Sequence, residues 1–237
     1  MTQMHKGFLL IGVFLYAAFL APKIYAATPD AVNQVLQQGL PAQPAALATL
    51  TEALKKEYEA RHNVVALVFY AYGLLRQADG YAATNDFIHA SEYAKSGFFW
   101  LDEAVDLQEK NQRVRYLRAR VDAYLPADSG RCVVTVQDTE HMLADRAIWA
   151  TTIRDHILAM RYRALRHCKD TTRANALLAQ IKGQNAALAQ SLTQNFNVVP
   201  EWDSEELTQV LLPLKKGEKM SGEILAVNCV LLLILFF

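Results

Sequence analysis

Apolar side chains recur at intervals of three and four residues along much of the chain, which is the spacing that places them on one face of a helix. The stretch 44–61 shows this pattern at Leu47, Leu50, Leu54 and Tyr58. The following run, 64–75, is apolar all round, which predicts a fully buried helix, with a pair of core strands as the alternative. Gly80 is expected to end it.

The stretch 84–111 carries two apolar stripes on one predicted helix, with Thr84 or Asn85 as its N-cap. The first stripe is Ala90, Ala94, Gly97, Phe98, Leu101 and Val105, and the second is Trp100, Ala104 and Leu107. A surface helix shows one apolar face, whereas the inner helices of stacked hairpins are covered from two directions. We therefore expect this helix to be covered on both stripes.

The rest of the chain predicts further helices separated by short polar turns. One is expected at 112–126, two within 132–168, one at 171–195 and a short one within 200–214 that Asp203 or Ser204 caps. Only "CVVTV" at 132–136 has the β-branched content typical of a strand. The pattern predicts an all-α fold of eight or so helices, in antiparallel hairpins stacked in a repeat-like array.

The first 26 residues have the pattern of a secretory signal peptide. Lys6 precedes an apolar run from Phe8 to Ala21, Pro22 breaks it, and Ala26 offers a small residue for cleavage. We expect residues 1–26 to be removed and the protein to be exported, which fits a bacterial periplasm. An uncleaved membrane anchor is the alternative.

The helical domain is expected to span 27–221, followed by an apolar tail at 222–237. Residues 224–237 are apolar except for Asn228, and as a helix they would extend about 21 Å, short of the roughly 30 Å hydrocarbon core. The tail is therefore interpreted as a membrane contact or as a terminal helix of the domain, and a disordered or atypical end is a third interpretation.

Composition narrows the classes of function. Hydrophobic residues make up 52% of the chain, which is enough for a large core, and Lys+Arg and Asp+Glu both number 24. A formal charge of zero argues against a nucleic-acid-binding protein. The sequence contains none of the motifs G-x-S-x-G, P-loop, G-x-G-x-x-G or H-E-x-x-H. We expect binding rather than catalysis, with no cofactor and no metal.

Two adjacent segments resemble the tetratricopeptide family. "LDEAVDLQEKN" is similar to the end of such a repeat, at Ala104, Val105, Leu107 and Asn111, and "VRYLRARVDAYLP" is similar to the first helix of the next, with Ala119 at the small packing position. The resemblance covers residues 62–126. It implies helical hairpins in a curved solenoid that binds peptides or proteins, and it implies no catalysis.

Two sets of polar residues could carry chemistry. Arg154, His156, Arg163 and His167 form a candidate anion- or partner-binding face, which with Asp155 could also hold a metal or could be a solvated surface. Asp138, His141 and Asp145 have a closer spacing but include only one His, so the set is not diagnostic of a metal.

Other side chains have a candidate role in binding a partner. Tyr72, Phe98 and Trp100 could line an aromatic groove, although aromatic residues at helical spacing usually belong to the core. The basic cluster Arg113, Arg115, Arg118 and Arg120 could face an acidic partner or a membrane, or form the outer surface of the array.

Cys132 and Cys168 are predicted to form a disulfide, because an exported compartment is oxidising. In an antiparallel hairpin, opposite residues are equidistant from the turn, and the midpoint of the two cysteines is residue 150. Thr152 and Asp155 have the spacing of a capping box, so a helix can begin there. A turn at 144–145 would separate the cysteines by about 18 Å, and they would then be free thiols. Cys229 is left unpaired.

These patterns predict an exported helical binding or assembly module that recognises a protein or peptide partner in the cell envelope, with possible membrane contact through 224–237. Two alternatives remain open. One is an exported all-helical enzyme with an unlocated carboxylate/His site, and the other is an accessory subunit of a membrane complex that the tail tethers.

Overall fold

The computed structural model describes residues 30–196 and 198–214, without the side chain of Arg146. Within this part the fold is all-α, as predicted, and no β-strand occurs. The α-helices are α2 (Ala31–Gln38), α3 (Pro44–Arg61), α4 (Val64–Ala83), α5 (Phe87–Asp106), α6 (Gln112–Asp122), α7 (Cys132–Ala144), α8 (Thr151–His167), α9 (Thr171–Gln184), α10 (Ala186–Gln194) and α11 (Ser204–Glu206). The predicted signal peptide, the apolar tail and Cys229 lie outside the described residues.

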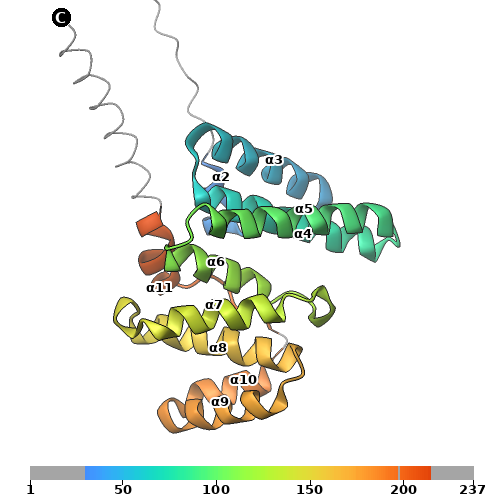
Figure 1. The fold of residues 1–237 in the computed structure, drawn as a ribbon. Helices are drawn as coiled ribbons and strands as arrows, with labels where there is room; N and C mark the ends of the chain where they lie inside the picture. The colour runs from blue at the N-terminus through green and yellow to red at the C-terminus, as the bar shows by residue number, and fades with distance from the viewer. Residues whose placement is uncertain (1–29, 197, 215–237) are drawn as a thin grey trace, which may run out of the picture.

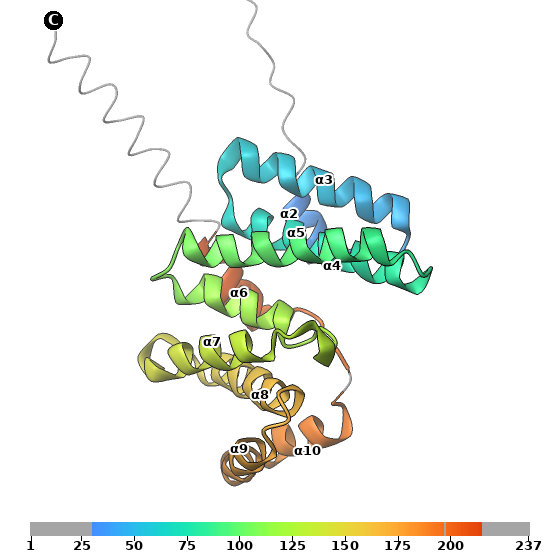
Figure 2. The same cartoon turned by 45° about the vertical axis from the view of Figure 1, so that its right-hand side comes forward.

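Consecutive helices pack as antiparallel hairpins that stack along one direction (Figure 1). Helices α2 to α5 form one end of the stack, α9 and α10 form the other, and α6 lies between the two halves. The view in Figure 2 shows the same order. The predicted stacked helical array is therefore confirmed. Among the described residues, the structure contains no helix whose length and apolar character would let it cross a membrane.

Short polar side chains set where many of these helices begin. Among the α-helices of the described residues, an Asp or Asn accepts a hydrogen bond from a backbone N–H of the first turn in seven cases: Asp30, Asn63, Asp86, Asn111, Asp170, Asn185 and Asp203. Each such N-cap stabilises a helix by about 1 kcal/mol. The predicted cap of α5 at Thr84 or Asn85 was wrong, because Asp86 makes the bond to His89 N.

Helix α4 is the centre of the core, as its all-apolar sequence predicted. Its first half is buried between α2, α3, α5 and α6. Gly80 was expected to end this helix but lies inside it, because α4 continues to Ala83 and a glycine in an exposed turn costs only about 1 kcal/mol.

Helix α5 packs closely on α4 but is not covered on both stripes. A Cβ atom at Gly97 would lie 2.8 Å from Leu75 and 3.0 Å from the Ala71 carbonyl oxygen, so only glycine allows this close approach. Leu107 of the second stripe is 55% exposed and its neighbour Phe99 is 57% exposed. The expectation of complete cover was therefore wrong for the outer part of the second stripe.

Two further segments differ from the sequence-based expectations. The strand-like "CVVTV" forms the first turns of α7, where Thr135 and Val136 are buried in the helical array while Val133 is exposed. The stretch 171–195 is two helices rather than one, since the Asn185 side chain accepts from Leu188 N and starts α10.

Charged side chains of α6 are paired with buried carboxylates. Asp138 of α7 is fully buried and accepts hydrogen bonds from Arg115 at 3.1 Å and from Arg118 Nε and Nη2 at 2.8 Å. Arg118 also donates to Asp102 of α5 at 3.1 Å. The basic cluster of this helix is thus largely internal, not an outer surface. Asp138 is used by two guanidinium groups while His141 and Asp145 are exposed, so these three residues do not form a metal site.

Arg131 extends the same network towards the start of α7. It donates to both oxygens of Asp102, at 2.6 and 2.9 Å, and through Nε to both oxygens of buried Asp122, at 3.0 Å. Burial would raise the pKa of Asp102, but the hydrogen bonds from Arg131 and Arg118 lower it overall. Burial raises the pKa of Asp122 to about 7 against the attraction of Arg131, so as the pH falls this carboxyl loses its charge before Asp102 does.

Asp138→Ala is expected to destabilise the fold by about 3–5 kcal/mol, because it leaves the largely buried Arg115 without a carboxylate and leaves Arg118 with Asp102 alone. Asp79→Ala is the control, since Asp79 contacts Arg76 at 3.5 Å on the exposed face of α4 and should contribute less than about 1 kcal/mol. Urea denaturation of both variants measures the difference. Equal losses of stability would contradict the role of the buried network.

The predicted disulfide between Cys132 and Cys168 is confirmed. The two Cα atoms are 5.6 Å apart, and the bond joins the first residue of α7 to the residue after α8. Helix α8 starts at Thr151, as predicted, but α7 already ends at Ala144, so the break is longer than a turn at 150–151 and includes the 3₁₀ turn Arg146–Ile148. The proposed capping box is wrong: the N-cap is Ala150, and it makes no side-chain cap bond.

Replacing both cysteines by serine is expected to cost about 3–4 kcal/mol of stability, because the bridge closes a loop with a sequence separation of 36. Thermal unfolding with and without reductant measures this loss. Thiol counting on the denatured, non-reduced chain should give one free thiol of the three cysteines in the sequence. Three free thiols would contradict the bridge.

Candidate functional site

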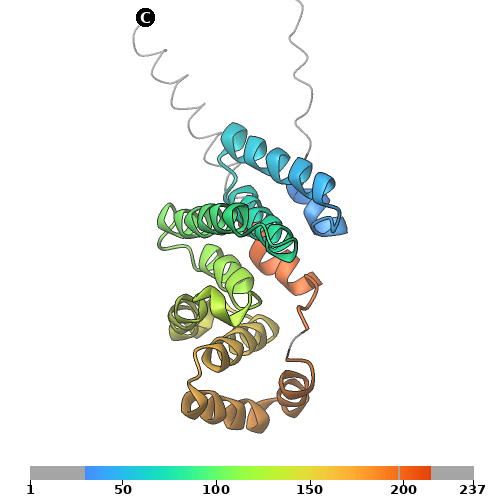
Figure 3. The same ribbon diagram turned by 90° about the vertical axis from the view of Figure 1, so that its right-hand side faces the viewer.

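The segment 198–206, which we call the strap, crosses back over the stack after α10. It leaves the α9–α10 end and brings α11 against α6, as Figure 3 shows most clearly. The ring of Trp202 contacts that of Phe69 in α4 at 5.8 Å and lies 4.7 Å from the Arg120 guanidinium. Arg120 Nη2 also donates to the Pro200 carbonyl oxygen at 2.6 Å. The strap therefore joins the two halves of the array.

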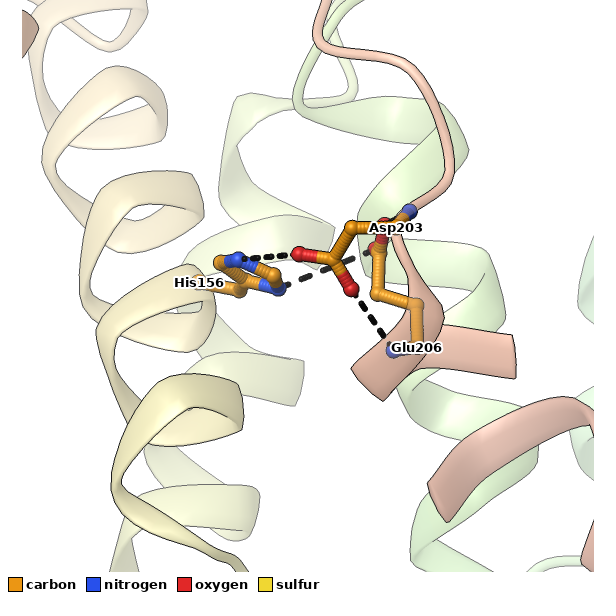
Figure 4. Close-up of side chains that lie close together, drawn as sticks. All are labelled: His156, Asp203 and Glu206. Carbon is orange, nitrogen blue, oxygen red and sulfur yellow. Dashed lines mark hydrogen bonds and ion pairs between the residues drawn. The ribbon is translucent and has the colours of Figure 1, made fainter. Parts of the chain in front are cut away.

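The strap ends in a cluster of His156, Asp203 and Glu206 (Figure 4). His156 extends from α8, and the two acids belong to the strap. His156 Nε2 lies 3.1 Å from Asp203 Oδ2, and Nδ1 lies 4.0 Å from Glu206 Oε1 and 3.2 Å from the Tyr116 hydroxyl. Asp203 and Glu206 form a capping box, which fixes both carboxylates at the start of α11.

Glu206 is 2% exposed, and both of its oxygens accept hydrogen bonds. Oε1 accepts from the Tyr116 hydroxyl at 2.8 Å and from Arg120 Nε at 2.9 Å, and Oε2 accepts from Asp203 N at 3.2 Å. Burial, together with the Glu206 charge, raises the pKa of Tyr116 well above its ordinary value. A metal ion here would have to compete with the Arg120 cation for the same oxygen. The donor set therefore favours an ion-pair cluster rather than a metal site. We call this cluster of Arg120, His156, Asp203 and Glu206 the latch, because it holds the strap in place.

A cavity of about 500 Å³ lies between α8, α10 and the strap. Its apolar wall consists of Ala159, Met160, Leu188, Leu192, Phe196 and Val198. Its polar wall includes the latch residues Arg120, His156, Asp203 and Glu206, together with Arg163. An apolar pocket with a few convergent polar groups is the usual form of a ligand site.

Arg163 of α8 is buried in this wall with 8% of its surface exposed. Its guanidinium lies between two aromatic rings, 4.8 Å from that of Tyr124 and 4.7 Å from that of Phe196. Its Nε has no hydrogen-bond partner, and no described carboxylate pairs with it. Burial lowers the pKa of Arg163. The cavity therefore contains a cationic group whose charge the described residues do not neutralise.

The four residues of the predicted anion-binding face are not brought together as one set. His156 and Arg163 both line the cavity. His167 contacts the Phe196 ring at 5.6 Å, behind the cavity wall, and burial and the Arg163 charge lower its pKa. Arg154 lies elsewhere, beside Asp155, and donates to Thr151 at 3.4 Å. Asp155 accepts from Asn185 and takes no part in the His156 cluster.

The three residues of the predicted aromatic groove are also separated. Tyr72 lines a second cavity, on the other side of the strap. Trp100 packs on Tyr70 at 6.1 Å, and Phe98 lies under the Arg131 guanidinium at 5.0 Å. A shared helical period does not bring them onto one surface, because α4 and α5 each present several faces to different neighbours.

Sequence reasoning missed the parts of the site that lie far apart in the chain. Arg120 and Glu206 are 86 residues apart, and no local pattern pairs them. The capping-box spacing of Asp203 and Glu206 was visible, but it predicts only the start of a helix. Comparison with known protein families, curated proteins and solved structures finds no match to this chain.

Glu206→Ala is expected to release the strap, because it leaves Arg120 as a buried cation without a carboxylate and removes a partner of Tyr116. The expected loss is about 3–5 kcal/mol, with faster amide exchange in residues 198–211. Glu201→Ala is the control, since that side chain is exposed on the same strap. Unchanged amide exchange in the strap of Glu206→Ala would contradict the latch.

Proposed function

We propose that this chain is an exported helical binding and assembly module, similar to tetratricopeptide proteins, that recognises a protein or peptide partner in the cell envelope. The observation that carries the proposal is the cavity between α8, α10 and the strap, with an apolar wall and a buried, unpaired Arg163. Such a pocket suits a ligand that presents both apolar and polar groups.

The surrounding framework supports binding because it holds two walls of the cavity, α8 and the strap, in place. The disulfide fixes the end of α8 near Arg163, and the latch fixes the strap. A preorganised site loses less conformational entropy when it binds its ligand. The export expectation rests on the N-terminal pattern of the sequence alone.

A second candidate function is an exported enzyme, and one observation supports it. His156 and Asp203 lie 3.1 Å apart on the cavity wall, which is the arrangement of a base and the group that orients it. His156→Ala separates the two functions. Loss of binding to the captured partner would place His156 in recognition, whereas loss of turnover with binding retained would favour catalysis.

The proposed function predicts that filling the cavity prevents partner binding. The tagged full chain is expressed in a Gram-negative host and captured from the solubilised envelope. Ala159→Trp, in the cavity wall, should reduce recovery of the partner at least tenfold, because an indole occupies the space of the ligand. Ala176→Trp, on the exposed side of α9, is the matched control. Circular dichroism confirms that both variants fold.

Equal recovery of the same partner by both tryptophan variants would contradict the role of the cavity. A parallel chain that lacks residues 222–237 tests the tail-tethered alternative. If the tail anchors the protein, this deletion moves it to the soluble fraction while capture through the cavity persists.

A further inference from the structure

We propose that Arg163 binds the C-terminal carboxylate of a peptide whose last residue is apolar and fills the cavity between α8, α10 and the strap. The inference rests on the proposed function, because it names the chemical class of the ligand. It begins from the contrast between Arg163 and the other buried arginine side chains of the described chain.

Those other side chains have carboxylate partners. Arg118 binds Asp138, Arg131 binds Asp102 and Asp122, and Arg120 binds Glu206. Arg163 is as deeply buried as Arg120, at 8% against 6% exposure, yet no described acid lies within ion-pair distance of it. A buried charge without a counter-charge is unfavourable, so a site that retains one gains from a ligand that supplies the anion.

The flanking rings orient this charge. Tyr124 and Phe196 lie at 4.8 and 4.7 Å from the guanidinium carbon, and both line the same cavity. Held between these rings, the planar guanidinium has a restricted orientation, and its fork of donors matches the two oxygens of a carboxylate. The aromatic contacts stabilise the cation but leave its hydrogen bonds to be made.

The neighbouring wall specifies what accompanies the carboxylate. Met160, Leu188, Leu192 and Val198 provide apolar surface on the same cavity, which suits an aliphatic or aromatic side chain. At about 500 Å³ the space is within the range of pockets for small ligands and terminal residues. An apolar group next to a carboxylate is the chemistry of a peptide that ends in Leu, Ile, Val, Met or Phe.

The acidic side of the cavity argues for a monoanion over a phosphate group. Glu201 and Asp203 are exposed on the strap and line the wall with Glu206. These carboxylates would repel a dianion, but they can accept hydrogen bonds from the backbone N–H groups of a peptide. The wall thus has a cation for the terminal carboxylate and acceptors for the residues before it.

The test uses a pool of hexapeptides with two randomised C-terminal positions, prepared both as free acids and as C-terminal amides. The pool is passed over the immobilised full chain, and mass spectrometry quantifies the bound peptides. We expect free acids with an apolar last residue to be enriched at least tenfold over their amides. A third pool of amides with Asp or Glu before the last residue distinguishes a side-chain carboxylate from the terminal one.

Arg163→Met should abolish this enrichment while the protein stays folded with an equal or higher Tm, because the substitution removes an unpaired buried charge. Arg173→Gln is the control, since its side chain is exposed on α9 away from the cavity, and it should change the enrichment less than twofold. Arg163→Lys keeps the charge without the fork and should bind at an intermediate level. It serves as the second variant if Arg163→Met does not fold.

Equal binding of acids and amides by the wild type would overturn the inference, as would unchanged enrichment by Arg163→Met or a preference for the side-chain acids. If partner capture still depends on Ala159 in those cases, the proposed function stands and only the carboxylate assignment fails. If enrichment of the free-acid peptides depends on Arg163 but Ala159→Trp leaves recovery of the partner unchanged, the peptide site stands and the assembly role fails.

Discussion

Charge pairing around α6 is the interaction on which the rest of the structure depends. This helix lies between the two halves of the stack, and its arginine side chains pair with carboxylates of three different elements. Arg118 joins it to α5 and α7, and Arg120 joins it to the strap. Loss of a carboxylate partner would leave a buried cation, so each pair constrains the position of the element that supplies the acid.

Arg163 is the exception to this pairing of buried arginine side chains with carboxylates, and it marks the candidate site. The buried side chains of Arg118, Arg120 and Arg131 have carboxylate partners from another helix or from the strap, whereas Arg163 has two aromatic rings and a cavity. Proteins often keep an unfavourable charge where binding requires it, at some cost in stability. The unpaired cation is therefore better explained by a ligand than by the packing of α8.

Local patterns in the sequence were sufficient to predict the helices, the hairpin break before Thr151 and the Cys132–Cys168 bridge, because each depends on residues close in the chain or on equal distances from a turn. The exposure of Leu107 and the return of the strap were not predictable in this way. A helical period tells which residues share a face, but it does not tell which neighbour covers that face. Pairing across 86 residues, as in Arg120 and Glu206, follows only from the assembled stack.

The walls of the cavity differ in how firmly the fold holds them. Helix α8 is fixed by the disulfide at one end and contacts the latched strap through His156. Helix α10 contributes Leu188 and Leu192 to the wall, yet among its residues only Ala189 is buried. A wall with little buried surface opens at low free-energy cost, since few contacts are lost. Arg163 and the strap are therefore the firmly held part of the site, and α10 is the part that can adjust to a ligand at low free-energy cost.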